Sequence, residues 1–538
     1  MDTGERDGTK SGATRTTIVR RAGVVAVGTL SSRILGAVRD AVIAASFAIG
    51  ATDAFFVAFT VPNALRVLLG EGAVSGAFIP VFSEVREQEG EERARVFFAG
   101  LVGTMFWVLV AVTALGMLAA PGFVVVYAGG FLDDPARYEL TVTLTRLVFP
   151  YIFLMGLAAL GIGALNAKKR FAVPAFAPGL LNISLIVAPF AFLPVVDSLS
   201  MPAVTCLVIG ALVGGVLQVL ALLPTLRAVG LWVRPRWGWK DPYVRKVYRL
   251  MVPLLAGVGV YQLNLILSRL FASFLPEGSL SYLYYSARLV ELPQGMFALA
   301  IASAALPTLS DLRSRGDNEE ARRVFRYGLR LALFVAIPAS VALLLLAEPT
   351  VMVLFGRGAF GAHEAAETAR ALRWQALGIW AVASVRTVVP LFHAYNDTKS
   401  PVLGSALNLV VFCGVAFALM GPLQHEGLAI AISSAAAVQL VALLWLLGRR
   451  VGPLGLGAMA GSVGRVCLAT AVMGGVVWWS VRGVDWTGAG TRPALMLRYA
   501  ATVLLGGAVY ALAGRLVGVE EVGDVWAALT RRVRRRRG

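Results

Sequence analysis

The sequence predicts an all-α protein that crosses a membrane many times. Of its 538 residues, 58% are hydrophobic and only 15% are charged, and the mean hydropathy is +0.74. Apolar segments of roughly 20 residues, the length that spans a bilayer as a helix, recur along nearly the whole chain. Short polar or Pro/Gly-rich breaks separate them. A soluble fold of ordinary composition is therefore excluded.

The apolar segments number about fourteen. Residues 1–21 are polar and basic, and the apolar part that follows is too long and too charged for a signal peptide, so residue 22 is expected to begin a retained helix. A basic tail, residues 518–538, follows the last segment. The segments begin at Ala22, Asp53, Val96, Tyr138, Pro174, Met201, Val244, Leu280, Tyr327, Ala365, Pro401, Glu426, Ala460 and Pro493.

Lysine and arginine are concentrated in alternate loops. With the N-terminus inside, the inward loops hold "KKR" at 168–170, several other basic groups and the tail "RRVRRRRG", whereas the outward loops are poor in both residues. This asymmetry predicts that both termini are cytoplasmic. The net charge of +18 is then mainly a topology signal, and attraction to anionic lipid explains it more simply than nucleic-acid binding does.

Three pairs of segments repeat in one register, about 228 residues apart. "PVFSEVREQEGEERARVF" from Pro80 matches "PTLSDLRSRGDNEEARRVF" from Pro307, and each is expected to be a helix exit followed by a mixed-charge loop. "PGFVVVYAGGF" matches "PTVMVLFGRGAF", and "AKKRFAVP" matches "AYNDTKSP". Chance similarity of loops is the alternative to a duplication.

A duplication of six helices predicts two lobes of the same orientation. They span residues 22–228 and 243–450, are related by a pseudo-two-fold axis along the membrane normal, and enclose a cavity near mid-bilayer. Residues 460–517 lie outside the repeat and are expected to form an appended helix pair.

No catalytic constellation stands out. The three cysteines lie in apolar segments, the three histidines are scattered, and no Gly-Lys pair is present to form a phosphate-binding loop. Neither an enzyme nor a bound cofactor is therefore expected.

Charged residues inside the apolar segments are the strongest functional signal. Arg33 lies roughly 17 Å into the first helix, near the middle of the hydrocarbon core, where an arginine costs about 2.5–3.5 kcal/mol. Such residues usually face a partner or a water-filled cavity. The other intramembrane arginines include Arg39, Arg66, Arg146, Arg269, Arg288 and Arg386, and the acids are Asp40, Asp53, Glu71 and Glu291.

The surplus of arginine predicts a cationic cavity for an anionic cargo. Guanidinium groups match phosphate oxygens bidentately, so a diphosphate is a natural ligand for two or three of them. The alternative is a structural pair between Arg33 and Asp40, which share a helix face while Arg39 is turned away. An exporter of organic cations would need the opposite charge, and a scaffold would tolerate loss of the arginines.

Long, ordered stretches also resemble a known family. "SSRILGAVRD", "ATDAFFVAFTVPNALRVLLGEGAVSGAFIPVFSE", "NAKKRFAVPAFAPGLLNI", "LFASFL" and "SLSYLYYSARLVELPQG" are similar to the MurJ (MviN-type) lipid II flippases of the MOP exporter superfamily. The resemblance runs from about residue 22 to residue 450. It implies a fourteen-helix, MATE-like flippase that works by alternating access in the bacterial cytoplasmic (inner) membrane.

The resemblance also implies a cargo and its site. The cargo is lipid II, an undecaprenyl-diphosphate-linked peptidoglycan precursor, and cell-wall synthesis proteins are the candidate partners. The family's cavity arginines fall on Arg33, Arg39, Arg66 and Arg288, with Asp40, Asp53 and Glu291 as the matching acids. A flippase for another polyprenyl-diphosphate glycan is the alternative.

This chain departs from its relatives at two places. Ala287 precedes Arg288 where relatives commonly have an acid, and the seventh and eleventh helices lack the carboxylates with which some relatives are thought to bind sodium.

The second helix is expected to bend or unwind during transport. The points at which it can bend or unwind are Pro62, Gly70, Gly72 and Gly76. An inside-negative potential drives anions outward, and proton coupling through Asp53 or Glu291 is the alternative.

Overall fold

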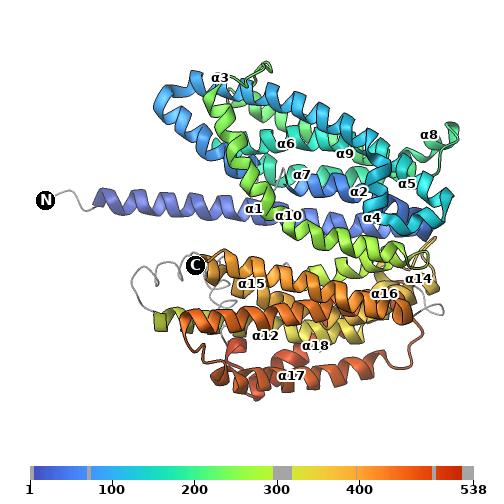
Figure 1. Cartoon of the computed structure of the whole chain (residues 1–538). Coiled ribbons are helices and arrows are strands. Elements are labelled where there is room, and N and C mark those ends of the chain that lie inside the picture. The colour runs from blue at the N-terminus through green and yellow to red at the C-terminus, as the bar shows by residue number, and fades with distance from the viewer. Residues whose placement is uncertain (1–4, 69–73, 295–317, 396, 487–491, 524–538) are drawn as a thin grey trace. The chain divides into compact units, whose positions relative to one another are not determined.

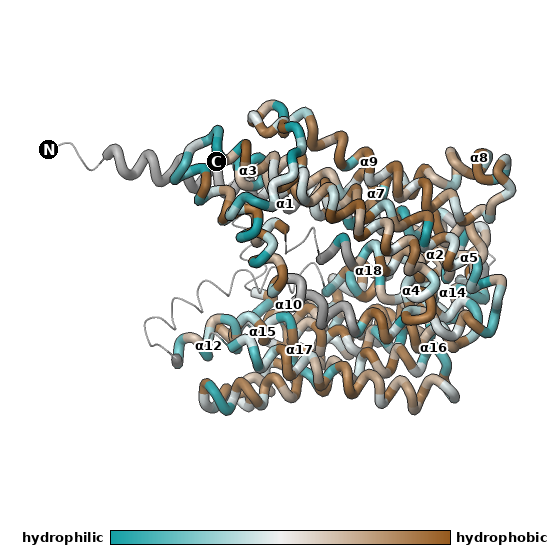
Figure 2. Tube along the Cα trace, turned by 45° about the horizontal axis from the view of Figure 1, so that its top comes forward, coloured by the Kyte–Doolittle hydropathy of each residue, from teal (hydrophilic) through white to brown (hydrophobic). Residues whose placement is uncertain are grey.

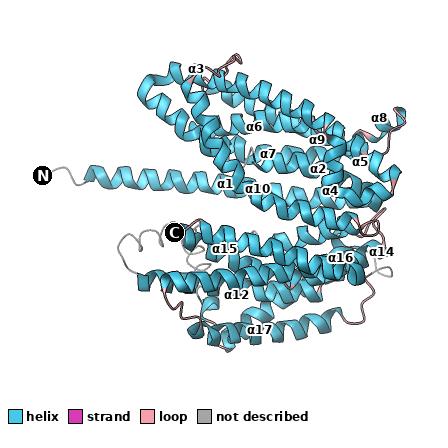
Figure 3. Cartoon of the chain, in the orientation of Figure 1, coloured by secondary structure: helices cyan, strands magenta, loops and turns pink. Residues whose placement is uncertain are grey.

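The computed structural model describes residues 5–68, 74–294, 318–395, 397–486 and 492–523 (Figure 1). Within these ranges the regular structure is helical, and no strand is present (Figure 3). The predicted all-α class is confirmed. A helix satisfies its backbone hydrogen bonds within one segment, which is what an apolar chain in lipid requires.

Length and composition allow eight described helices to cross a membrane, or nine if α14 (Ala362–Ala376) and α15 (Ile379–Ala394) form one bent span. The two longest far exceed what a bilayer needs: α3 (Val74–Leu118) has 45 residues and α16 (Lys399–Val451) has 53. Each is two helices joined at a kink, at Gly90 in α3 and at Gln424 in α16. Figure 2 shows apolar residues along much of the helices. All fourteen predicted starts fall in a described helix or within a few residues of one, and the count of fourteen stays a prediction.

The chain forms two compact units, Met1–Phe274 and Leu275–Gly538. In the first, α7 packs against α1 and α9, α3 packs against α6, and α2 packs against α5. Phe78, Phe82, Phe97 and Tyr151 are fully buried in its core. Besides α3, its elements are α1 (Glu5–Ser46), α2 (Ile49–Leu68), α4 (Ala120–Ala128), the 3₁₀ helix η2 (Gly129–Asp133), α5 (Pro135–Val148), α6 (Pro150–Ala167), α7 (Ala172–Ala191), α8 (Leu193–Ser198), α9 (Thr205–Ala228) and α10 (Pro242–Ser273).

Helix α10 belongs to the first unit by its contacts, although the sequence repeat begins the second copy at residue 243. Near its start, Lys246 Nζ donates to Glu84 of α3 at 2.6 Å. At its end, Ser273 Oγ accepts from the backbone N–H of Gly130 at 3.0 Å. The division into repeat-related lobes stays a prediction from the sequence.

The second unit holds the appended helix pair. Helices α17 and α18 pack together and against α12, and Met473, Val477 and Tyr510 are buried between them. Besides α14, α15 and α16, the unit contains a helix over residues 279–294, α12 (Asn318–Leu345), α13 (Ala347–Phe355), α17 (Gly457–Val481) and α18 (Arg492–Leu516).

One pair of the repeated segments folds alike in the two units. "PGFVVVYAGGF" forms α4 and η2, and "PTVMVLFGRGAF" forms most of α13 and the turn after it. The aromatic residues that close the two motifs, Phe131 and Phe360, are both buried. The partner of the Pro80 segment begins at Pro307 and lies mostly outside the described residues.

The mixed-charge segment after Pro80 is helical on both sides of Gly90, which differs from the loop expected there. Glutamate and arginine are good helix formers. Ion pairs at helical spacing join Arg93 to Glu89 at 3.2 Å and Arg95 to Glu92 at 3.2 Å, so the helix extends beyond its apolar part.

Candidate substrate-binding site

Arg39 is held in a fixed orientation within the first unit. Its Nε and Nη2 donate to one carboxylate oxygen of Asp40 at 2.9 and 2.6 Å. Its Nη1 donates to Asn182 Oδ1 of α7 at 2.9 Å. The Arg39 side chain is 13% exposed and Asp40 only 2%. A guanidinium fixed from two sides can present a stable positive charge to an anion.

Asn182 ties this arrangement to the body of α1. Its amide Nδ2 donates to the backbone carbonyl of Ser32, seven residues before Arg39 on α1, at 3.0 Å. Asn182 is itself buried. The side chain therefore positions Arg39 and joins α7 to α1 at the same time.

The Arg33–Asp40 pair expected as the structural alternative is wrong, because Asp40 pairs with its neighbour Arg39. Seven residues of helix rise about 10.5 Å, which is far for the short aspartate to bridge. The long Arg39 side chain instead folds back along the helix onto the adjacent carboxylate. Arg33 is half-buried.

Arg66 lies on α2, four residues after the buried Pro62. Its Nε donates to Asn63 Oδ1 at 3.0 Å. Phe59 of the same helix packs against the buried Tyr151 of α6, with 5.4 Å between the ring centroids. Arg66 is therefore oriented by its own helix, which packs on α6.

Asp53 is fully buried and forms an ion pair with Arg137 of α5 at 2.5 Å. The guanidinium of Arg137 also stacks on the ring of Phe131, 3.8 Å from its centroid. The pair joins the start of α2 to the start of α5. Asp53 was expected as a cavity acid, and this contact shows a partner for it within the first unit.

The second unit contains Arg288 and Glu291 on the helix over residues 279–294. Arg288 Nη1 donates to Glu291 Oε2 at 2.9 Å, and Nη2 donates to Tyr284 Oη at 3.2 Å. Arg288 is 39% exposed and Glu291 56%. Of the four predicted cavity arginines, three thus lie in the first unit and Arg288 in the second.

The remaining predicted residues concern the second helix and its exit. Pro62 lies inside α2, and Gly76 lies in the first turn of α3 against Leu254. Glu71, Gly70 and Gly72 lie outside the described residues.

Sequence reasoning missed Asn182 and Arg137. Arg137 lies just before the apolar segment that begins at Tyr138, where a basic residue carries no special signal, and Asn182 is one of few amides in an apolar helix. A buried polar side chain in a membrane helix requires a partner, and that signal could have marked Asn182.

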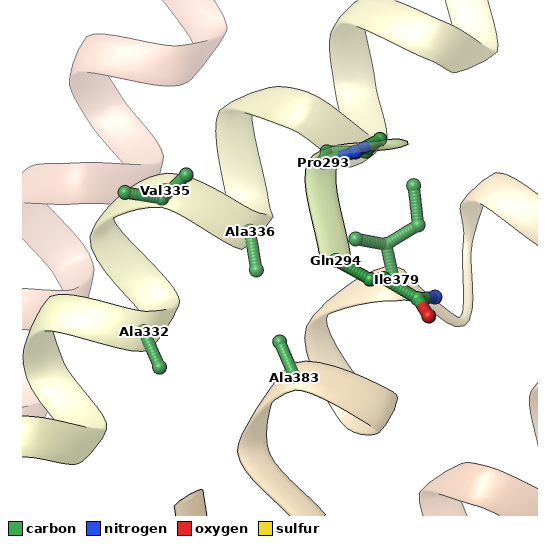
Figure 4. A pocket seen from close by; sticks show the side chains of 7 residues that line it. All are labelled: Pro293, Gln294, Ala332, Val335, Ala336, Ile379 and Ala383. Carbon is green, nitrogen blue, oxygen red and sulfur yellow. The ribbon is translucent and has the colours of Figure 1, made fainter. Parts of the chain in front are cut away.

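A small crevice lies in the second unit (Figure 4). Its lining is apolar apart from Gln294, so it does not resemble an anion site. The lining residues are Pro293, Gln294, Ala332, Val335, Ala336, Ile379 and Ala383. Among the described residues, no group of three His, Cys, Asp or Glu side chains could hold a metal ion.

The apolar helices define a multi-pass helical membrane protein. Two solved structures share the fold. One is lipid II flippase MurJ in an inward closed conformation, with a TM-score of 0.74, 22% identity and coverage of 91% of this chain and 98% of that one. The other is an inward-facing multidrug resistance MATE transporter of the MOP superfamily, with a TM-score of 0.63, 16% identity and coverage of 78% and 95%.

The family model described as lipid II flippase MurJ matches residues 43–488. The probable lipid II flippase MurJ of Vibrio cholerae is 36% identical over 472 residues, covering 85% of this chain and 88% of that protein. The lipid II flippase MurJ of Burkholderia cenocepacia is 34% identical over 476 residues, with coverage of 86% and 90%. The chain belongs to the MurJ family of lipid II flippases. Arg66 and Arg288 lie inside the range of the family model, and Arg33 and Arg39 lie just before it.

Proposed function

We propose that this protein moves lipid II from the inner to the outer leaflet of the bacterial cytoplasmic membrane. Membership of the MurJ family carries the proposal, because relatives at 34–36% identity over most of the chain bear that function in their names. The alternatives are not favoured. None of the similar proteins given above is named for another polyprenyl-diphosphate glycan. The multidrug transporter is only 16% identical, so it shows a shared fold and not a shared cargo.

We infer that the diphosphate of the cargo binds to Arg33, Arg39, Arg66 and Arg288. Support comes from the first unit, where Asp40 and Asn182 fix Arg39 and where Asn63 orients Arg66. Arginine forks suit the planar oxygen arrangement of a phosphate. The polyprenyl tail stays in lipid while the headgroup crosses.

Alternating access moves the cargo without a chemical step. Pro62 and the glycines after it allow the second helix to bend, and the two lobes rock about the predicted pseudo-two-fold axis. An inside-negative potential contributes about 2.3 kcal/mol per outward-moving charge per 100 mV. Both termini are cytoplasmic, and cell-wall synthesis proteins that make or use lipid II are the partners.

Binding of purified full-length protein to lipid II tests the site. Wild type should prefer lipid II to undecaprenyl monophosphate and to an organic cation, and Arg39→Ala and Arg288→Ala should each weaken lipid II binding by about tenfold, the loss of one charge-assisted contact. Arg323→Ala is the matched control, because Arg323 is 67% exposed and pairs only locally with Glu320.

Lipid II binding that is unaffected by both substitutions would return these arginines to a structural role. Tighter binding of the organic cation than of lipid II would contradict the proposed cargo itself.

A further inference from the structure

The segment that joins α9 to α10 has an unusual composition, which the proposed transport mechanism does not explain. Residues 231–240, here called the strap, read "LWVRPRWGWK" and contain three tryptophans, three basic residues and no acid. The strap is neither helix nor strand, and it lies wholly in the first unit.

Backbone contacts fix the strap along α3. The N–H of Arg236 donates to the carbonyl of Ala99 at 3.1 Å, and the N–H of Gly238 donates to Thr104 Oγ1 at 3.0 Å. A side chain at Gly103 would place its Cβ only 2.1 Å from the Arg236 carbonyl oxygen. Because no side chain separates the two backbones at these points, the strap has a defined position.

The end of the strap marks its depth along α3. Asp241 accepts a hydrogen bond from Arg93 of α3 at 2.8 Å and caps α10 by accepting from the N–H of Tyr243 at 2.9 Å. Ala99 lies six residues, or about 9 Å of helix rise, beyond Arg93. The strap therefore runs from the charged part of α3 to the first turns of its apolar part, which corresponds to the headgroup layer of a bilayer.

The strap's large side chains are nevertheless exposed. Trp232, Trp237 and Trp239 are 57%, 61% and 45% exposed, and Arg234, Arg236 and Lys240 are exposed beside them. Tryptophan is enriched at membrane interfaces, where its ring meets apolar chains and its N–H meets polar headgroups. Clustered basic residues at that depth attract anionic lipid.

We propose that the strap is a binding site for the headgroups of anionic phospholipids. Its three tryptophans lie in the interface, and Arg234, Arg236 and Lys240 contact the lipid phosphates. A soluble protein partner fits less well, because the strap is hydrogen-bonded beside the apolar part of α3 at headgroup depth. The site holds the α3–α10 end of the first unit at the membrane surface and is independent of the cargo.

Quenching of tryptophan fluorescence by brominated lipids tests this site. Full-length protein is placed in bilayers of phosphatidylcholine and phosphatidylglycerol, with bromine on one lipid at a time. The strap's signal is the difference between wild type and the Trp232→Phe, Trp237→Phe, Trp239→Phe variant. We expect brominated phosphatidylglycerol to quench this signal at least about twofold more than brominated phosphatidylcholine.

Two variants separate charge from position. Replacing Arg234, Arg236 and Lys240 by glutamine should abolish the preference for brominated phosphatidylglycerol. Both brominated lipids should still quench the strap's signal. Gly103→Val should displace the strap. The preference for phosphatidylglycerol should then fall, although the strap keeps its three basic residues. The control is Trp479 of α17, which is 76% exposed: the signal lost in Trp479→Phe should show no lipid preference.

Two results would overturn the proposal. Strap tryptophans that neither lipid quenches would place the strap against water or a protein partner. A preference for phosphatidylglycerol that persists in the glutamine variant would show that the basic residues do not bind the headgroups. Thermal unfolding of each variant confirms that it is folded, so either result is interpretable.

Discussion

At the scale of single residues, the chain stabilises charge inside its apolar helices by pairing it across long distances in sequence. Asn182 is 143 residues from Arg39, and Arg137 is 84 residues from Asp53. The sequence showed which arginines and acids fall in apolar segments, because such a charge is visible directly, and their place within the membrane stays a prediction. It did not predict their partners, since those depend on which helices pack together.

The Asp53–Arg137 pair should be structurally costly to break. Asp53→Asn leaves Arg137 without its carboxylate in a largely buried position, which is expected to cost about 3–5 kcal/mol of unfolding free energy. Chemical unfolding of the purified protein measures this loss. Asp53→Asn combined with Arg137→Gln should recover part of it, because no uncompensated charge then remains.

The exposed Asp133→Asn is the control for this pair and should change stability by less than about 0.5 kcal/mol. Equal stability of wild type and Asp53→Asn would contradict a structural role for the pair and favour Asp53 as a titrating group in transport.

Asp397, which precedes α16, should make the protein sensitive to acid. Burial opposes its ionisation, but hydrogen bonds from Ser400 and Lys399 and the nearby Arg450 outweigh burial and lower the pKa of Asp397. A lowered pKa in the folded state stabilises the protein above the ordinary aspartate range. That contribution is complete above about pH 4 and is lost as the pH falls through the lowered value.

The melting temperature measured between about pH 3 and pH 7 checks this expectation. Wild type should lose stability at the acid end, and Asp397→Asn should be less stable at neutral pH with a flatter dependence on acid. Parallel curves for the two proteins would show that Asp397 does not contribute.

At the scale of elements, the positions of the apolar helices were predictable and their extensions were not. The hydropathy of each segment marks where a helix crosses the membrane, whereas the helical parts around Gly90 depend on charge pairs and local propensity. The close approach of the strap to α3 was also invisible, because it depends on where Gly100 and Gly103 meet a distant segment. The C-terminal helix pair was predicted as an addition, and the structure shows how it is attached.

Three arginines on one face of α12 add polar contacts to the apolar packing of this pair. Arg322 donates to the carbonyl of Val451 at 3.2 Å, and Arg326 donates to the carbonyl of Leu454 at 3.3 Å, at the junction before α17. Arg330 pairs with Glu521 at 2.7 Å, just after α18. Their spacing of four residues places them in a row along the helix.

Removing Arg330 should loosen the segment after α18. Arg330→Leu leaves the buried Glu521 without its cation, so amide hydrogen exchange in residues 517–523 should rise and stability should fall by about 3 kcal/mol. Arg323 lies on the same helix but is 67% exposed, so Arg323→Leu should change neither the hydrogen exchange of residues 517–523 nor the stability. Unchanged exchange in Arg330→Leu would show that packing alone holds the helix pair.

At the scale of the whole molecule, the family model and the curated relatives place the chain among lipid II flippases, and the solved structures show its fold. The sequence predicted the all-α class and the family, because long ordered stretches carry that information. The role of the intramembrane arginines stays a prediction. The relation between the two lobes and the cavity shared by their arginines stay proposals, since they depend on the transport states that the protein adopts.

Translocation of lipid II in proteoliposomes tests the central claim most directly. Fluorescent lipid II that crosses the bilayer becomes accessible to an impermeant quencher, and its rate is compared for wild type, Arg39→Ala, Arg288→Ala and Arg323→Ala with an imposed potential. We predict rapid translocation by wild type and Arg323→Ala, a loss of at least about tenfold in the other two variants, and no movement of fluorescent phosphatidylcholine. A wild-type rate equal to that of protein-free vesicles, or equal rates in all four proteins, would contradict the account.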